Sequence, residues 1–257
     1  MADLLLDLGN SALKWAVGSG GAVCSPTRRI GYEACGDPRV VAGQLYGAWP
    51  EAAPPGRILA VSVTSEELEA GLEVELQRHW GGTGILWLRS TPEALGVRNG
   101  YETPAELGAD RWAAVLAAHA RAPDGACIVD AGTAVTVDAL ASGGEHLGGA
   151  IFPGRTMLGQ SLTERASRLP GMKLGSRSAI PARSTQEAMA GGVQVGYEAA
   201  VRRMIDEVCS SLPRQGARLL VTGGDAAEVA KMLDRDAEQV PSLVLEGVAR
   251  WGASLRS

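Results

Sequence analysis

Lysine is scarce in this chain of 257 residues, which contains only Lys14, Lys173 and Lys231. None of the three stands in a Gly-Lys-Ser or Gly-Lys-Thr sequence, which excludes a P-loop nucleotide site. The chain also lacks a G-x-G-x-x-G motif after a strand, a G-x-S-x-G motif and an H-E-x-x-H motif. These absences argue against a dinucleotide-binding fold, a serine hydrolase and a zinc protease.

Histidine and cysteine are too few and too scattered to form a zinc site, with three His, four Cys and no C-x-x-C pair. Cys127 lies in an apolar segment, where we expect a buried and unreactive thiol. No apolar run reaches the length of about 18 residues that a membrane span needs. Asp3 and Asp7 interrupt the apolar stretch at the N-terminus, which argues against a signal peptide. We therefore expect a cytoplasmic protein with no membrane partner.

The charge of the chain gives no support for nucleic-acid binding, because the formal net charge is −5 and no dense run of Lys or Arg occurs. The hydrophobic content of 46% and the charged content of 21% are typical of a folded globular protein. At this length the chain has room for one large domain or two ordinary ones.

One short pattern occurs twice, as Asp7-Leu8-Gly9-Asn10-Ser11 and as Asp130-Ala131-Gly132-Thr133-Ala134. Each copy follows a short apolar run and precedes a second extended segment. Either copy alone is more simply a tight hairpin, in which Gly supplies the turn and Asp bonds the local backbone. Because the pattern recurs in the same context, we expect two phosphate turns, each with backbone N–H groups and one carboxylate. Facing each other, they would hold a nucleotide polyphosphate.

The order of predicted elements is similar in the two halves. In the first half we expect strands at 3–8, 12–18, 27–32, 58–63 and 85–88, and helices at 65–80 and 110–121. In the second half we expect strands at 135–139, 148–151 and 219–221, and helices from 155 to about 170, 184–212, 226–233 and 245–255. A polar loop is expected at 171–183. The halves divide near residue 122 without a flexible linker, which predicts domains at 1–122 and 123–257.

Three glycines fall inside the long predicted helix, namely Gly191, Gly192 and Gly196. Glycine lowers helix stability by up to about 1 kcal/mol relative to Ala. We therefore expect another helix or a ligand to come close to this part of the helix. A further Gly-rich turn, Gly223-Gly224, follows a strand and would suit an adenosine group. Strand–turn–strand phosphate loops in two halves are typical of the superfamily of actin, the sugar kinases and the heat-shock ATPases.

The segment Gly108-Ala109-Asp110-Arg111 allows two compatible interpretations. Asp110 could cap the helix that follows it. The same carboxylate could accept a proton from an alcohol that attacks a γ-phosphate, with Arg111 holding an anionic substrate group. Local sequence does not decide between a cap alone and a cap that also has a catalytic role.

An ordered set of motifs resembles the type III pantothenate kinases. They are Asp7 to Ser11 with Lys14-Trp15, Val97 to Tyr101, Leu107 to Trp112, Asp130 to Asp138, His146 to Gly154, Ser161-Leu162, Ser184-Thr185 and Thr222 to Asp225. The matches follow one another in the expected order from residue 3 to residue 250. The resemblance implies a duplicated ribonuclease-H-like (actin-like ATPase) α/β fold with two similar halves and a central cleft. It also implies ATP-dependent phosphorylation of pantothenate at its primary hydroxyl, the first step toward coenzyme A.

The resemblance also implies roles for individual residues. Asp110 matches the catalytic base. The family's first phosphate loop matches Asp7, Leu8, Gly9, Asn10, Ser11, Ala12, Leu13 and Lys14, with Asp7 on the Mg²⁺ side, acting through water, and Thr133 matches a further phosphate contact. The pantothenate site matches Tyr101, Gly108, Ala109, Asp110, Arg111 and Thr185. Asp130 matches the ligand of a monovalent cation, K⁺ or NH₄⁺. Family members are homodimers whose substrate site lies near the subunit interface.

The departures from the family pattern are few. Ser11 stands where many relatives have Thr, and it retains the hydroxyl. The role of Lys14 stays open between a phosphate contact and a structural ion pair. Two other functions also remain open: a nucleotide-binding accessory or regulatory protein without catalysis, and a kinase for another small hydroxy acid or sugar.

Overall fold

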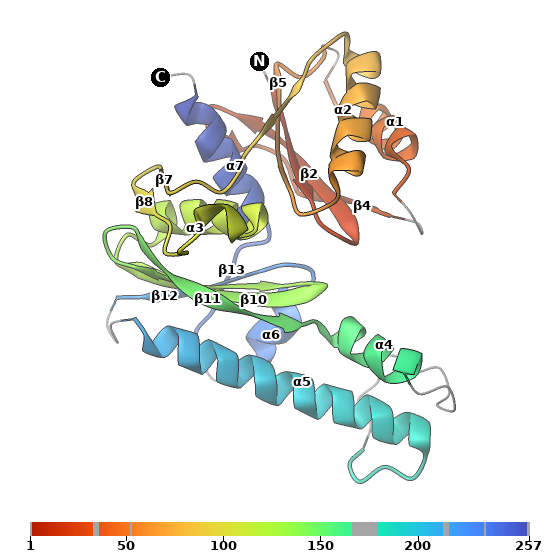
Figure 1. Ribbon diagram of the computed structural model, residues 1–257, viewed down its shortest axis with the longest axis vertical. Coiled ribbons are helices and arrows are strands. Elements are labelled where there is room, and N and C mark those ends of the chain that lie inside the picture. Colours follow the sequence, from red (N-terminus) through yellow and green to blue (C-terminus); the bar gives the residue numbers. More distant parts are fainter. Residues whose placement is uncertain are drawn as a thin grey trace. The chain divides into compact units, whose positions relative to one another are not determined.

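The computed structural model describes residues 2–32, 36–51, 53–165, 179–212, 216–233 and 235–255. Its contacts divide the chain into two compact units (Figure 1). The first unit comprises residues 1–123, 142–146 and 242–257, and the second comprises residues 124–141 and 147–241. Both units are α/β in composition, as the sequence predicts. The last part of the predicted helix at 155–170 and most of the predicted loop at 171–183 lie outside the described residues.

The first unit is built on a sheet with the strand order β3-β2-β1-β5-β6, and β4 also pairs with β2. β1 is antiparallel to β2 and parallel to β5. All six residues of β1 are buried, as expected of a central strand covered on both faces. The elements of this unit are β1 (Asp3–Leu8), β2 (Ala12–Ser19), β3 (Ala22–Val23), β4 (Arg28–Gly31), α1 (Pro38–Ala48), β5 (Arg57–Ser62), α2 (Glu66–Trp80), β6 (Ile85–Trp87), β7 (Glu93–Ala94), β8 (Val97–Arg98), the 3₁₀ helix η1 (Pro104–Glu106), α3 (Ala109–Arg121) and α7 (Leu243–Ser254).

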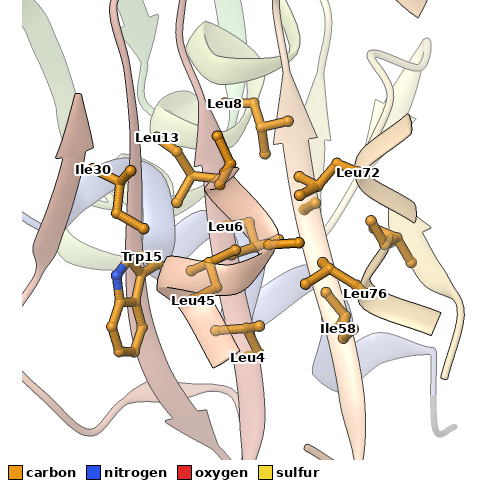
Figure 2. Close-up of a cluster of buried hydrophobic side chains, with 14 of the residues drawn as sticks. Leu4, Leu6, Leu8, Leu13, Trp15, Ile30, Leu45, Ile58, Leu72 and Leu76 are labelled. Carbon is orange, nitrogen blue, oxygen red and sulfur yellow. The ribbon is translucent and has the colours of Figure 1, made fainter. Parts of the chain in front are cut away.

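One face of this sheet packs against α1 and α2. Figure 2 shows the apolar cluster between them, which includes Leu4, Leu6, Leu8, Leu13, Trp15, Ile30, Leu45, Ile58, Leu72 and Leu76. The side chains of β1 alternate between faces, so Leu4, Leu6 and Leu8 all enter this cluster. The free energy of burying this surface fixes the register of β1, because a slip of one residue would turn these leucines away from the helices.

The helices α3 and α7 pack against each other in the same unit. A Cβ atom at Gly247 of α7 would lie 1.9 Å from the carbonyl oxygen of Ala113 in α3, so only glycine permits this approach. Arg121 of α3 also donates two hydrogen bonds to Glu246 of α7, at 2.7 and 2.8 Å. The C-terminal helix therefore belongs by its contacts to the unit that contains the N-terminus.

The second unit is built on the strand order β13-β12-β9-β10-β11. β9 is antiparallel to β10 and parallel to β12. Tyr197, Val201 and Ile205 on one side of α5 pack on this sheet, and Val229 of α6 joins the same core. The elements are β9 (Gly125–Ala131), β10 (Ala134–Ala141), β11 (Glu145–Pro153), whose first two residues belong to the first unit, α4 (Arg155–Arg165), α5 (Thr185–Ser210), β12 (Arg218–Thr222), α6 (Ala226–Met232) and β13 (Glu238–Gln239).

Two details differ from what the sequence predicts. The helix α1 was not expected, although Asp37 at its N-cap and Pro38 at its first position are start signals. The glycines Gly192 and Gly196 are exposed, and no group of the described residues lies within 4 Å of a Cβ placed there. No helix in the described parts of the chain combines the length and apolar character that a membrane crossing requires.

Candidate active site

The first repeated turn joins β1 to β2. The two strands stay paired up to Leu8 and Leu13, and the backbone N–H of Gly9 donates to the carbonyl oxygen of Ala12 at 3.1 Å. Asn10 and Ser11 at the tip are exposed. The turn is therefore a short hairpin that presents its amide and hydroxyl groups to solvent, as the sequence predicts.

Asp7 lies at the end of β1, opposite Lys14 of β2, and its side chain is buried. The ammonium of Lys14 lies 3.6 Å from a carboxylate oxygen of Asp7. Tyr32 follows β4, and its backbone N–H donates to the carbonyl oxygen of Ser11 at 3.2 Å. Burial, and to a smaller extent the negative charge of Asp7, raises the pKa of Tyr32 well above its usual range. Lys14 therefore points back to the first turn, and the phenol of Tyr32 stays neutral.

Val63 connects this turn to the segment at Gly108. The N–H of Val63 donates to the carbonyl oxygen of Leu8 at 3.1 Å. A Cβ atom at Gly108 would lie 3.8 Å from Val63 Cγ1 and 2.7 Å from Asp110 Oδ1. Val63 thus lies beside both the first turn and the segment Gly108–Arg111. These two segments are distant in the sequence but belong to the same unit.

Asp110 is the second residue of α3 and is half-buried. The N-cap position belongs to Gly108, so the interpretation of Asp110 as the N-cap is wrong. Asp110 Oδ1 accepts a hydrogen bond from the N–H of Arg111 at 2.7 Å. A carboxylate in the first turn is also favoured by the helix dipole. These interactions orient the carboxylate of Asp110. The N-cap residue of α3, Gly108, makes no side-chain hydrogen bond to the helix.

Arg111 and Tyr101 contact each other directly. Arg111 Nη1 donates to the hydroxyl oxygen of Tyr101 at 2.7 Å, and the guanidinium carbon lies 5.5 Å from the centre of the Tyr101 ring. Only 6% of Arg111 is exposed. The structure therefore brings together Tyr101, Gly108, Asp110 and Arg111, four residues that the sequence assigned to one site.

The second repeated turn joins β9 to β10 through Gly132 and Thr133. The N–H of Gly132 donates to the carbonyl oxygen of Ala134, two residues on, at 3.0 Å, whereas Gly9 in the first turn donates to Ala12, three residues on. The second loop is one residue shorter, since Ala131 pairs with Val135 but Leu8 pairs with Leu13. Thr133 is exposed. The N–H of Gly154 donates to the carbonyl oxygen of Thr133 at 2.9 Å, and a Cβ at Gly154 would lie 2.5 Å from that oxygen. Glycine at 154 thus lets the segment before α4 approach the turn.

Asp130 lies at the end of β9, beside Thr222 of β12. Gly223 follows with a φ of +96°, and a Cβ there would lie 2.4 Å from Asp130 Oδ1 and 2.2 Å from the carbonyl oxygen of Ala131. The N–H of Asp225 donates to the same Ala131 carbonyl at 2.9 Å. A carboxylate oxygen and a carbonyl oxygen therefore gather around Gly223.

A polar cluster near the Gly-rich turn was not predicted. Burial raises the pKa of Asp225, and Arg155 opposes that rise. Arg155 forms an ion pair with Glu228 and a hydrogen bond with Gln194. Burial and the charge of Asp225 raise the pKa of Tyr197 to about 12. These groups come from α4, from α5, from α6 and from the turn before α6. Because these segments are far apart in the sequence, no local pattern could have revealed the cluster.

Thr185 is the first residue of α5 and is exposed. Ser184 caps the helix, and its hydroxyl accepts a hydrogen bond from the N–H of Glu187 at 3.2 Å. This cap leaves the hydroxyl of Thr185 outside the capping interaction.

The residues present fit the ions that the sequence motifs imply. Among the described residues, no three His, Cys, Asp or Glu side chains gather in a metal-binding group. Mg²⁺ commonly binds through one or two carboxylates together with substrate phosphates and water, so Asp7 alone is a sufficient protein contribution. Carboxylate and carbonyl oxygens suit a monovalent cation such as K⁺, and Asp130 and Ala131 provide one of each beside Gly223.

Comparison with known families gives a match over most of the chain. Residues 3–207 match the family described as type III pantothenate kinase. A type III pantothenate kinase from Halorhodospira halophila is 46% identical over 248 residues, which cover 96% of both chains.

Comparison with solved structures shows the fold. A Baf family protein from Campylobacter jejuni is similar with a TM-score of 0.59 at 22% identity, covering 98% of each chain. The activator of the 2-hydroxyisocaproyl-CoA dehydratase from Clostridium difficile, solved with bound ADPNP, is similar with a TM-score of 0.55 at 13% identity. It covers 99% of this chain and 95% of its own. The expected actin-like ATPase fold is confirmed by these similarities.

Proposed function

The chain belongs to the type III pantothenate kinase family, and from this membership we propose how its residues perform the reaction. The chain transfers the γ-phosphoryl group of ATP to pantothenate in the first step of coenzyme A biosynthesis. ATP is the co-substrate, with a divalent metal ion. The family match over residues 3–207 is the observation that carries this assignment.

Asp110 is proposed as the general base. Its carboxylate accepts the proton of the primary hydroxyl of pantothenate while the hydroxyl oxygen forms a bond to the γ-phosphorus. The bond between that phosphorus and the β–γ bridging oxygen breaks, and ADP leaves. The half-buried position of Asp110 at the start of α3 and its hydrogen bond from the N–H of Arg111 support this role.

Pantothenate is proposed to bind beside Asp110. The guanidinium of Arg111 matches the carboxylate of pantothenate in charge and geometry. Tyr101 holds that guanidinium, Gly108 and Ala109 form the adjoining backbone, and Thr185 contributes its hydroxyl. The hydrogen bond between Arg111 and Tyr101, and the exposure of Thr185, support these assignments.

The first turn is proposed to bind the phosphates of ATP. The loop from Asp7 to Lys14, with Leu8, Gly9, Asn10, Ser11, Ala12 and Leu13 between them, offers backbone N–H groups, a hydroxyl and an ammonium. Asp7 would hold Mg²⁺ through water, and Thr133 of the second turn is proposed as a further phosphate contact. The bound ion would supply positive charge that offsets the negative charge of the phosphates.

Asp130 is proposed as the ligand of a monovalent cation, K⁺ or NH₄⁺. Such a cation would supply positive charge near the phosphates. In a P-loop kinase, a lysine supplies part of that charge. The carboxylate oxygen of Asp130 and the carbonyl oxygen of Ala131, both close to Gly223, support this assignment.

The protein is further proposed to be a cytoplasmic homodimer. Apolar side chains on the second unit support an interface there, since Ile151, Met157 and Val195 are 63%, 42% and 54% exposed. The exposed glycines Gly192 and Gly196 lie on the same helix as Val195. A dimer mass in light scattering that Val195→Glu reduces to a monomer mass supports this assembly, and a monomer mass for the native chain contradicts it.

A panel of small hydroxy acids and sugars in a coupled ADP-release assay tests the function. We expect turnover with pantothenate that needs Mg²⁺ and rises with K⁺ or NH₄⁺. Turnover with another acceptor and none with pantothenate would assign a different kinase activity. Failure to rescue a strain without any other pantothenate kinase, despite nucleotide binding in vitro, would support the accessory function instead. That alternative is not favoured by the family match.

A further inference from the structure

His146 is a buried polar side chain to which the proposed reaction assigns no role. It is the second residue of β11 and only 1% of it is exposed. Its Nδ1 accepts a hydrogen bond from the N–H of Gly100 at 3.5 Å. Its ring stacks on the ring of Tyr101, with centroids 6.0 Å apart and planes inclined by 12°. His146 therefore contacts both the backbone and the ring of the segment that carries Tyr101.

Asn99 fixes the backbone of the same segment. Its Oδ1 accepts a hydrogen bond from the N–H of Tyr101 at 3.0 Å. Its Nδ2 donates to the carbonyl oxygens of Thr91 and Pro104, at 3.2 and 3.3 Å. Asn99 is itself buried, so these bonds are shielded from water. Asn99 thus makes the shorter contacts that hold the backbone at Tyr101, and His146 adds the 3.5 Å hydrogen bond from Gly100. Asn99 makes no such contact with the ring, whose orientation is held by stacking on His146.

The orientation of the Tyr101 ring decides where its hydroxyl lies. That hydroxyl accepts the 2.7 Å hydrogen bond from Arg111. The ring also lies beneath the guanidinium, so a rotation of the ring would disturb both contacts with Arg111. An arginine that binds a carboxylate loses affinity when its guanidinium has to be ordered during binding. A fixed Tyr101 ring therefore prepares Arg111 for an anionic substrate group.

We propose that His146 is a positioning residue for pantothenate, because it holds the Tyr101 ring in the orientation that fixes the Arg111 guanidinium. The inference rests on the proposed function of Tyr101 and Arg111. It makes His146 act through two other residues, without contact to the reacting atoms. The effect therefore falls on the binding of pantothenate and spares both ATP binding and phosphoryl transfer.

Two substitutions separate the ring contact from the hydrogen bond. His146→Ala removes both, and we expect the KM for pantothenate to rise about 3- to 10-fold, the range of a lost aromatic pair. The KM for ATP and kcat should stay within about twofold. His146→Phe keeps a ring for stacking and should restore most of the pantothenate affinity. Calorimetric titration with pantothenate should show the same order of affinities without turnover.

His119 provides the matched control. It is a second histidine of the first unit, on α3, where its Nε2 lies 3.6 Å from a Cβ placed at Gly96. It makes none of the contacts described for His146. His119→Ala should leave the KM for pantothenate unchanged. An equal rise in that KM for both alanine variants, with equal losses of melting temperature, would overturn the inference by showing a general loss of packing.

A double-mutant cycle distinguishes this inference from the proposed site. In a Tyr101→Ala background, His146→Ala should add no further rise in the KM for pantothenate, because the ring that it positions is gone. A full additional rise would overturn the inference. An unchanged KM in His146→Ala beside a raised KM in Tyr101→Ala would overturn it and leave the proposed site standing. Unchanged pantothenate affinity in both Tyr101→Ala and Arg111→Lys would overturn the site itself.

Discussion

Gly223 and Asp130 lie so close that a Cβ atom on Gly223 would be 2.4 Å from Oδ1 of the Asp130 carboxylate. The φ of Gly223 is +96°, a conformation that residues with a Cβ rarely adopt. At the next residue, Gly224, no group of the described part of the chain other than its immediate neighbours lies within 4 Å of an added Cβ. A side chain is therefore excluded at Gly223 and has room at Gly224. Of the two glycines, only Gly223 contacts the proposed cation site at Asp130 and Ala131.

Gly223→Ala is expected to destabilise the second unit and displace Asp130. The strained backbone conformation alone costs about 1–3 kcal/mol, and the overlap with Ala131 and Asp130 adds to it. We expect a lower melting temperature and a weaker response of activity to K⁺. Gly224→Ala is the control, with little change in either measurement. Equal effects of the two substitutions would contradict this explanation.

Asp130→Asn is expected to abolish the dependence of activity on a monovalent cation. The amide keeps the size of the side chain and removes the negative charge that favours a cation. We expect at least a tenfold loss of turnover in KCl, by analogy with the ~10- to 100-fold losses that follow changes around metal ligands. Activity compared in potassium and sodium salts should then be the same. Asp124→Asn, at an exposed carboxylate of the same unit, should keep the full potassium response.

Asp110→Asn is expected to reduce kcat by about 10²- to 10⁴-fold, the contribution of a general base. The binding of ATP, measured by calorimetry, should change little, because Asp110 is assigned to the acceptor hydroxyl. Glu106→Gln, at an exposed carboxylate on η1, should leave kcat unchanged. Full activity of Asp110→Asn would show that another group accepts the proton.

Glu246 is expected to make the stability of the first unit depend on pH. Burial alone would raise the pKa of Glu246, but hydrogen bonds from Arg121 and Ser242 outweigh it and lower the pKa. A carboxyl whose pKa is lower in the folded state stabilises the fold above its unfolded pKa of about 4.3. That stabilisation is lost as the pH falls through the lower, folded-state pKa. Glu246→Gln should therefore lower stability by about 1–2 kcal/mol at pH 7.

Thermal unfolding at several pH values checks this expectation. The difference in melting temperature between the native chain and Glu246→Gln should shrink as the pH falls below about 4. The control is Glu145→Gln, since Glu145 pairs with Arg98 at 3.3 Å and both side chains are more than half exposed. Such a surface pair contributes about 0–1 kcal/mol. A difference for Glu246→Gln that does not vary with pH would refute the linkage.

Periodicity and local turn chemistry predicted most of the elements near the site. β1 was predicted at its observed bounds, and α2 and α3 were each predicted within one residue of their starts, because their patterns are local. The helix α1 was missed, although Asp37 and Pro38 mark its start. The N-cap of α3 was also misjudged, because Gly108 caps it through the backbone and no side-chain pattern marks such a cap.

The sequence by itself determined that a hairpin turn follows Asp7 and another follows Asp130, because a glycine between two extended segments favours a tight turn. It did not determine the loop lengths, which differ by one residue. Only the tertiary structure decided which distant groups surround them. The contacts of Val63 with Leu8, of His146 with Tyr101 and of Gly223 with Asp130 each join separate segments. Such contacts depend on how helices and strands pack, and packing follows from the shape of the whole core, which no local pattern of residues describes.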